Sequence, residues 1–297
     1  MADRLFHGDA AAVCAALPDD VRFDLVYLDP PYSVGTVMTM RESAGERRGR
    51  KQRRSGRDAY VDDSDVEALI AMLSTSLGAI HGRMRDHAVL YLHLDYRAVH
   101  EAKMAADGVF GRGDFVGEIA WTPGNGGRGA RSFTVTHQTI LIYAKGGKKG
   151  ALFRSDHPLL REPYADTSLS MHFRHHDEDG RRYRERTING KTYRYYADEG
   201  RRLGSVWTDI PAMNANTPLR KEATGYPTQK PERLLERIIR MSSREGDVVA
   251  DLMCGSGTTL AVAAALDRRF VGGDVSSVAI EVTRKRLADH PLTFRAL

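Results

Sequence analysis

The feature that most constrains the fold is the tetrapeptide Asp29-Pro30-Pro31-Tyr32, which directly follows the apolar run Phe23–Leu28. The run predicts a buried strand. The tetrapeptide then places a carboxylate, a rigid double proline and an aromatic ring at the carboxyl end of that strand. Open α/β sheets hold their ligand crevice at this end of their strands, so the tetrapeptide is a candidate functional site.

A second transition from strand to turn lies far downstream. Residues 248–252 are typical of a strand, Gly255-Ser256-Gly257 of a glycine-rich turn, and residues 258–266 of a helix. Glycine is needed where a ligand comes close to the backbone, and the helix directs its first N–H groups at that ligand. This order of elements predicts a second binding site.

The glycine turn departs from two common nucleotide-binding patterns. A dinucleotide fingerprint would carry Gly or Ala where Leu260 stands, and a phosphate-binding loop would need Gly-Lys-Ser/Thr. Asp274 ends the next predicted strand, 17 positions past Gly257, near the spacing at which a carboxylate binds ribose hydroxyls. A nucleoside-type cofactor is therefore the better interpretation.

Strands and helices alternate along the rest of the chain. Further strands are predicted at residues 4–7, 87–94, 115–121, 138–144 and 270–274. Further helices are predicted at residues 64–85, 98–106, 231–243 and 277–288. The first of these helices opens with the capping box Ser64-Asp65-Val66-Glu67. The alternation favours an α/β fold with a seven-stranded, doubly wound, mostly parallel sheet that is covered on both faces.

Two stretches break the alternation, and both are basic. Residues 36–57 have no hydrophobic period, which predicts a mobile loop, and residues 41–57 hold eight basic against two acidic side chains. Residues 146–206 predict a β-rich insertion with a hairpin around Asn189-Gly190. In a chain of net charge +5, such uneven basicity favours a polyanionic partner, although solvated surfaces would give the same pattern.

The composition excludes several classes of protein. No run approaches the roughly 18 apolar residues of a membrane span, and the first residues lack a signal-peptide pattern. Only Cys14 and Cys254 are present, so a disulfide framework is not expected. We therefore expect a cytoplasmic protein without a membrane partner.

Three motifs in chain order resemble a known family. They are Asp29-Pro30-Pro31-Tyr32, then Tyr226-Pro227-Thr228-Gln229-Lys230-Pro231, then residues 251–259. Their order is similar to that of the β class of S-adenosylmethionine-dependent DNA amino-methyltransferases. The resemblance implies a Rossmann-like, circularly permuted fold. A catalytic part would span residues 1–145, a target-recognition insertion residues 146–206, and a cofactor-binding part residues 207–297.

The resemblance also implies a set of residues that bind S-adenosylmethionine. In chain order they are Asp9, Ala10, Thr228, Lys230, Asp251, Gly255, Ser256, Gly257, Thr258 and Asp274. Asp274 would bind the ribose, Asp9 the adenine, and Lys230 would lie beside the amino-acid end of the cofactor. Two simpler interpretations stay open, because Asp9 could be a helix cap and Lys230 a solvated residue. Leu252-Met253 departs from the Pro-Phe pair that the family often carries.

The tetrapeptide suits chemistry on an exocyclic amine, whose lone pair is delocalised into the base. Hydrogen bonds from the amine to Asp29 and to the Pro30 carbonyl would localise that lone pair, and Tyr32 would stack on the everted base. This chemistry needs no metal. Neither cysteine follows a proline, so attack at cytosine C5 through a covalent intermediate is not expected.

The resemblance favours adenine N6 as the target, because the tetrapeptide begins with Asp. Cytosine N4 is the alternative, and a non-catalytic DNA-binding subunit of the same fold is another. Double-stranded DNA would be bound by the basic side chains of the insertion, Arg181, Arg182, Arg184, Arg186, Lys191 and Arg194. The candidate protein partners are a second copy of the chain, in a homodimer, and a cognate restriction endonuclease. The expected location is the nucleoid of a bacterium or phage.

Overall fold

The computed structural model describes residues 2–31, 36–39, 57–62, 65–124, 133–154, 156–213 and 218–297. These residues form two compact units. The larger unit comprises residues 1–152 and 205–297, and the smaller unit comprises residues 153–204, which lie within the predicted insertion. The finer division of the larger unit into catalytic and cofactor-binding parts stays a prediction.

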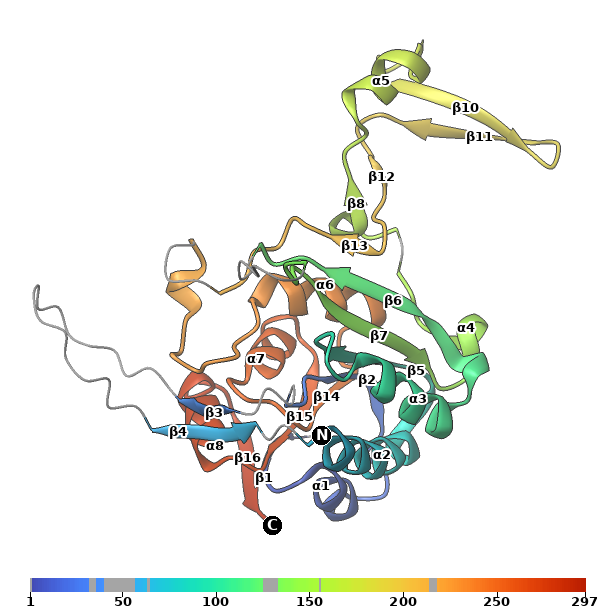
Figure 1. The fold of residues 1–297 in the computed structure, drawn as a ribbon. Coiled ribbons are helices and arrows are strands. Elements are labelled where there is room, and N and C mark those ends of the chain that lie inside the picture. The colour runs from blue at the N-terminus through green and yellow to red at the C-terminus, as the bar shows by residue number, and fades with distance from the viewer. Residues whose placement is uncertain are drawn as a thin grey trace, which may run out of the picture. The chain divides into compact units, whose positions relative to one another are not determined.

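The larger unit is built on a nine-stranded sheet with the order β13-β6-β7-β5-β2-β14-β15-β1-β16 (Figure 1). The strands are β1 Asp3–His7, β2 Phe23–Leu28, β5 Met84–Leu94, β6 Phe115–Trp121, β7 Gln138–Ala144, β13 Val206–Trp207, β14 Val248–Asp251, β15 Arg269–Asp274 and β16 Leu292–Ala296. All neighbouring strands run parallel except the two pairs that include β7. The predicted doubly wound, mostly parallel α/β sheet is confirmed.

The predicted number of seven strands is wrong, because β13 and β16 add to the two edges of the sheet. Strand β13 has only two residues, and four of the five residues of β16 are exposed. Neither segment therefore carries the buried apolar run that identifies a strand in a sequence.

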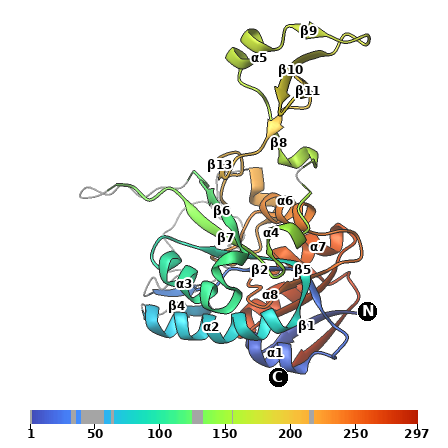
Figure 2. The ribbon, with the colours of Figure 1, turned by 90° about the vertical axis from the view of Figure 1, so that its right-hand side faces the viewer.

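Helices cover both faces of the sheet (Figures 1 and 2). On one face lie α1 Ala10–Ala16, α2 Val66–Arg83 and α3 Val99–Phe110, and on the other lie α6 Glu232–Ser242, α7 Thr258–Ala265 and α8 Ser277–Arg286. Strand β2 lies in the middle and is buried along its whole length, as expected of a parallel strand between two helical layers. The shorter helices of this unit are α4 Gly147–Gly150, η1 Arg112–Asp114 and η3 Pro218–Glu222.

Helix α2 begins one residue later than the capping box implies. Asp65 is the N-cap, and its side chain accepts a hydrogen bond from the Ala68 N–H at 3.0 Å. Ser64 lies outside the described residues. The helix ends at Arg83 and β5 begins directly at Met84, so the predicted boundary, with a helix to residue 85 and a strand from residue 87, is wrong. Of the helices in the described ranges, none is both long and apolar enough to cross a membrane.

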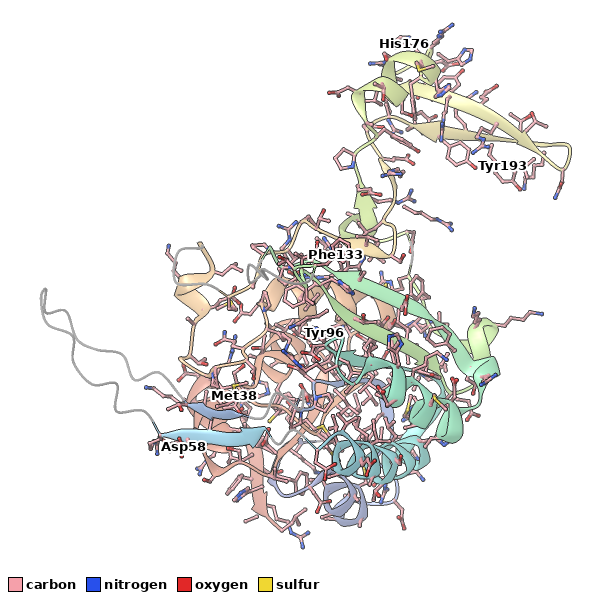
Figure 3. All side chains as sticks on the ribbon, in the orientation of Figure 1. Met38, Asp58, Tyr96, Phe133, His176 and Tyr193 are labelled. Carbon is pink, nitrogen blue, oxygen red and sulfur yellow. The ribbon has the colours of Figure 1, made fainter. Side chains whose placement is uncertain are left out.

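The prediction of a loop over residues 36–57 is wrong at its first four residues. These form β3 Thr36–Thr39, which pairs antiparallel with β4 Asp58–Asp62, and Met38 and Asp58 mark the two strands in Figure 3. Arg57 holds the ribbon against α8 with a two-fold ion pair to Glu281, at 2.9 and 3.0 Å. The Ser276 hydroxyl also donates to a backbone carbonyl of β4. Residues 40–56 of the predicted loop lie outside the described residues.

The described residues of the smaller unit hold two small antiparallel sheets, one short α-helix and one 3-10 turn. The three-stranded sheet joins β9 His175–His176, β10 Arg182–Ile188 and β11 Lys191–Tyr196, and the two-stranded sheet joins β8 Arg161–Glu162 and β12 Arg201–Arg202. The helical segments are η2 Pro158–Leu160 and α5 Asp166–His172. Asn189 and Gly190 have φ values of 50° and 75°, as a tight hairpin turn requires, so the predicted hairpin is confirmed.

Candidate active site

Four neighbouring parallel strands bring acidic residues to one edge of the sheet. Strands β2, β14, β15 and β1 are adjacent in this order, and their carboxyl ends lead to Asp29, Asp251, Asp274 and Asp9. All four carboxylates line one pocket of about 220 Å³ in the larger unit. Carboxylates that are up to 265 positions apart in the sequence (Asp9 to Asp274) thus share one site.

The pocket also brings together most of the other predicted site residues. In addition to the four carboxylates, it is lined by Ala10, Pro31, Thr228, Lys230, Gly255, Ser256 and Thr258. Pro30 is buried and does not line the pocket, nor does Gly257. Tyr32 lies outside the described residues.

The backbone of the glycine turn explains its residue types. Gly257 precedes α7 with φ 71°, and a Cβ at this position would lie 2.7 Å from the Thr283 Oγ1. Gly272 on β15 makes room for a leucine at position 260, because a Cβ on Gly272 would lie 2.3 Å from the Leu260 Cδ1. The close approach of helix and strand that a dinucleotide fingerprint achieves with a third glycine on the helix is achieved here by a glycine on the strand.

Asp274 ties the glycine turn to the end of β15. Its Oδ2 accepts a hydrogen bond from the Gly255 N–H at 2.9 Å, and its Oδ1 accepts one from the Ser276 N–H at 2.8 Å. Burial raises the pKa of this carboxyl, and the two backbone donors oppose that rise. Because each carboxylate oxygen has two lone pairs, both can still accept from a ligand hydroxyl.

Asp251 is the most strongly perturbed carboxyl of the pocket. Burial raises its pKa to about 7, with smaller contributions in the same direction from Asp29 and Asp274. Hydrogen bonds from the Thr259 side chain and from the Met253 N–H, the latter at 3.2 Å, act in the opposite direction. The group therefore changes charge near neutral pH, which is frequent at functional sites.

Lys230 forms an ion pair with Asp29 inside the pocket. Its ammonium group donates to the Asp29 Oδ2 and, at 3.4 Å, to the Thr228 carbonyl. The residue is only 7% exposed, so its interpretation as a solvated residue is wrong. Among the described lining residues, Lys230 is the one cation beside four carboxylates.

The alternative interpretation of Asp9 as a helix cap is confirmed. Its Oδ1 accepts a hydrogen bond from the Ala12 N–H at 2.8 Å, at the start of α1. Asp9 also lines the pocket, so the cap geometry does not remove it from the site.

Several lining residues were missed by the sequence analysis, chiefly Tyr27, Met72, Ser76, Tyr226, Leu235 and Val275. Tyr27 could have been found, because strand alternation places it on the same side of β2 as Asp29. Its hydroxyl lies 2.7 Å from the Nδ1 of His93, a buried residue of β5. Burial lowers the pKa of His93 to about 3, so this histidine is neutral at physiological pH.

The six basic residues predicted to bind DNA all lie in the smaller unit, and five of them contact other groups within it, including Lys191, whose ammonium lies 5.4 Å from the centre of the Tyr193 ring. Arg181 pairs with Asp198 and Glu199, and Arg194 pairs with Glu185 at 3.2 Å. Arg182 donates to the backbone carbonyls of Leu169 and Phe173, and Arg184 lies over the rings of Tyr164, Phe173 and Tyr195. Arg186 and Lys191 are exposed.

Known proteins resemble this chain over most of its length. A family model described as DNA methylase matches residues 23–285. The Type II methyltransferase M.EcaI of Enterobacter cloacae is 25% identical over 303 residues, which cover 89% of this chain and 64% of that protein. The DNA adenine methyltransferase YhdJ of Escherichia coli strain K12 is 25% identical over 306 residues, which cover 96% of this chain and 83% of YhdJ. The chain thus spans less than two thirds of the length of M.EcaI.

Two solved structures share the fold. TTHA0409 from Thermus thermophilus, complexed with S-adenosyl-L-methionine, has a TM-score of 0.55 and 20% identity, and the match covers 99% of each chain. The cytosine-N4-specific PvuII DNA methyltransferase has a TM-score of 0.58 and 12% identity, over 99% of this chain and 89% of that one. Because the family model matches most of the chain, this protein belongs to the family of N6 and N4 DNA methylases.

Proposed function

We propose that the protein is a site-specific DNA adenine-N6 methyltransferase that uses S-adenosylmethionine. The observation that carries this proposal is the shared pocket, in which Asp29 of the catalytic motif lies with Asp251 and Asp274 of the cofactor motif. One pocket is thus lined by Asp29, which can accept a hydrogen bond from an amine, and by Asp251 and Asp274, which can bind a nucleoside.

The charge of the pocket fits this cofactor. S-adenosylmethionine carries a sulfonium and an ammonium group against a single carboxylate, so it is a net cation. Four lining carboxylates attract such a ligand, and the ammonium of Lys230 complements its carboxylate end. The apolar side chains of Leu252 and Val275 also line the pocket and provide a surface for a flat ring.

The residues that would hold the cofactor are those that the resemblance implies and that line the pocket. Asp274 would accept hydrogen bonds from ribose hydroxyls, Asp9 and Ala10 would lie at the adenine end, and Thr228 with Lys230 would lie at the amino-acid end. The remaining contacts would come from Asp251, Gly255, Ser256 and Thr258, while Gly257 would act through the shape of the turn. When bound, S-adenosylmethionine supplies an electrophilic methyl group on a positively charged sulfur.

Asp29 prepares the amine of the base. Its carboxylate accepts an N–H hydrogen bond, and the nitrogen lone pair then turns away from the ring. The Pro30 carbonyl as the second acceptor stays a prediction, because Pro30 does not line the pocket. Lys230 fixes the orientation of the Asp29 carboxylate through their ion pair. The buried walls keep water away from the amine, so most of the rate acceleration comes from orientation. Tyr32, through its aromatic ring, would support the everted base.

Adenine is preferred over cytosine on two grounds. The catalytic motif begins with Asp29, and YhdJ, named a DNA adenine methyltransferase, aligns with 96% of this chain. The family and the basic side chains of the smaller unit support double-stranded DNA as the substrate. A homodimer and a cognate restriction endonuclease stay predictions.

A methyl-transfer assay tests the proposal. Wild-type protein is incubated with unmethylated plasmid DNA and S-adenosylmethionine labelled in its methyl group, and the digested nucleosides are separated. We expect label in N6-methyladenine. Label in N4-methylcytosine would overturn the choice of base, and DNA without label would overturn the activity. Asp29→Ala should lower the rate by about 10³-fold or more while cofactor binding, measured by calorimetry, persists.

A further inference from the structure

The β10–β11 hairpin of the smaller unit has two chemically different faces. Residues directly opposite each other in an antiparallel pair lie on the same face. The pairs Arg184 with Tyr195, Arg186 with Tyr193 and Ile188 with Lys191 therefore form one face. The pairs Tyr183 with Tyr196, Glu185 with Arg194 and Thr187 with Thr192 form the other.

The charges and hydroxyls of the second face are satisfied within the hairpin. Arg194 lies 3.2 Å from Glu185 and 4.1 Å from the centre of the Tyr183 ring. The hydroxyls of Thr187 and Thr192 are 3.0 Å apart. We call this the paired face, because a ligand there would have to displace existing contacts.

On the first face, the half near α5 is packed. The guanidinium of Arg184 lies 5.2 to 5.6 Å from the ring centres of Tyr164, Phe173 and Tyr195. Phe173 is only 1% exposed. This half serves the small core of the unit.

The half of the first face near the turn is exposed and basic. We call it the outer basic face, and it consists of Arg186, Ile188, Lys191 and Tyr193. Ile188 is 45% and Tyr193 40% exposed, and Figure 3 labels Tyr193 on the hairpin. In the described part of the chain, neither Arg186 nor Lys191 forms an ion pair, and no acidic side chain lies on this face.

The chemistry of this face suits DNA. The major groove, about 12 Å wide, admits a two-stranded β-ribbon. Arginine can bind the guanine edge with two hydrogen bonds, and apolar side chains can contact the thymine methyl group. A lysine beside them neutralises a phosphate. Arg186, Ile188 and Lys191 provide these three functions on one exposed surface, and Tyr193 adds an aromatic ring.

We propose that the outer basic face is the surface with which this chain reads double-stranded DNA, through the major groove. Arg186 contacts base edges, Lys191 holds a phosphate, and the paired face points away from the DNA. This assignment rests on the proposed function, since it takes DNA to be the substrate.

The test compares variants of the two faces. Arg186→Ala and Lys191→Ala remove charge from the outer basic face. Thr187→Ala combined with Thr192→Ala alters the paired face at the same distance from the turn. Arg174→Ala is the charge-matched control, because Arg174 is an exposed basic residue of the smaller unit outside the hairpin. Circular dichroism and thermal melting check that each variant is folded.

Affinity for duplex DNA that contains the modified site of the wild-type enzyme is measured by fluorescence anisotropy over a series of salt concentrations. Arg186→Ala should weaken binding about tenfold and reduce the preference for this duplex over an unrelated one. Lys191→Ala should weaken binding to both duplexes alike and lower the slope of log affinity against log salt by about 0.9. The control and paired-face variants should bind within about twofold of wild type, which is well below the tenfold effect expected of Arg186→Ala.

Arg186→Lys separates base reading from phosphate binding. Lysine keeps the charge but lacks the two-pronged geometry, so the sequence preference should stay lost in Arg186→Lys. Full recovery of both affinity and preference in Arg186→Lys would show that the two-pronged geometry is not needed and overturn the base-reading role of Arg186. Equal affinities for the variants of both faces and for Arg174→Ala would overturn the whole proposal. A changed oligomeric state with unchanged DNA affinity would do the same, since the face would then be a subunit contact.

Methyl transfer by the wild-type protein is measured in parallel. If the enzyme methylates DNA but the outer-face variants bind normally, the face assignment fails and the proposed function stands. If wild-type protein transfers no methyl group to DNA, the proposed function fails, and the face assignment loses its basis as well.

Discussion

The side chain whose ionisation most affects this site is the buried carboxyl of Asp251. Its pKa is raised from the ordinary 3.8 to about 7, chiefly by burial. Between these two values the folded protein binds a proton that the unfolded chain has released. The contribution of Asp251 to the free energy of unfolding is therefore fully present below pH 3.8 and is lost as the pH rises to about 7.

Asp251→Asn should accordingly stabilise the ligand-free protein at neutral pH. We expect the free energy of unfolding to exceed that of wild type by up to about 4 kcal/mol at pH 8, with a difference that shrinks toward pH 4. Urea denaturation at several pH values measures this difference. The effect of the buried, neutral His93 on the free energy of unfolding is the same in both proteins, so it does not enter the difference. A difference in the free energy of unfolding that does not vary with pH would contradict the raised pKa of Asp251.

Cofactor binding should show the opposite trend with pH. The ionised Asp251 attracts a cationic ligand and the protonated form does not, so affinity for S-adenosylmethionine should rise as the pH passes from 6 to 8. Below pH 7 the expected slope is up to about tenfold per pH unit. Calorimetric titrations of wild type and Asp251→Asn give the comparison. The affinity of the variant should depend less on pH than that of wild type. An equal dependence in both proteins would show that the ionisation of Asp251 does not control cofactor binding.

The ion pair of Lys230 and Asp29 allows a third prediction for single residues. Their side chains are 8% and 15% exposed, so Lys230→Met leaves a largely buried carboxylate without its partner. We expect a loss of about 3–5 kcal/mol in the free energy of unfolding, most of which the double variant with Asp29→Asn recovers. Arg57→Met breaks the exposed pair with Glu281 and should cost less than about 1 kcal/mol. Similar losses in both variants would argue against a special role for burial.

At the scale of secondary structure, the turn between β14 and α7 forms part of the pocket lining, through Gly255 and Ser256. Gly257→Ala combines an unfavourable positive φ with a steric clash at Thr283, so we expect a loss of about 2–4 kcal/mol. Gly246→Ala is the matched control, since Gly246 has φ 82° and nothing within 4 Å of its Cβ position. It should cost about 1–2 kcal/mol, for the backbone conformation alone. Equal melting temperatures for the two variants would show that the Thr283 side chain can move aside without loss of stability.

The elements themselves could be predicted to different degrees. Strands β6 and β7 have the predicted bounds, and β14 and β15 differ by one residue, because buried apolar runs stand out in a sequence. Strands β3, β4, β13 and β16 were missed. They are short or lie at edges, and their pairing depends on partners distant in the chain, which local patterns do not report.

At the scale of the whole molecule, the two candidate sites belong to different units. All residues that line the pocket belong to the larger unit, and the outer basic face belongs to the smaller one. Replacing residues 153–204 with a short Gly/Ser linker should therefore preserve folding and cofactor affinity, and it should weaken DNA binding by about 10²-fold or more. Calorimetry and anisotropy measure the two affinities. Loss of cofactor binding in a folded variant would contradict the separation.

The sequence by itself determined the order of the motifs, the α/β class and the identity of the acidic residues at the strand ends. These follow from local patterns, since apolar runs, prolines and glycines act on their own neighbourhood. The sequence also predicted the hairpin, because Asn189-Gly190 specifies its turn locally.

Only the tertiary structure decided which side chains meet. The ion pair of Lys230 with Asp29 joins residues 201 positions apart, and Gly272 compensates for Leu260 across two elements. The structure also separated Arg181 and Arg194, which form ion pairs, from Arg186 and Lys191, which lie together on the exposed half of one hairpin face. Such contacts depend on strand order and on packing, and a linear sequence does not specify the distances that decide them.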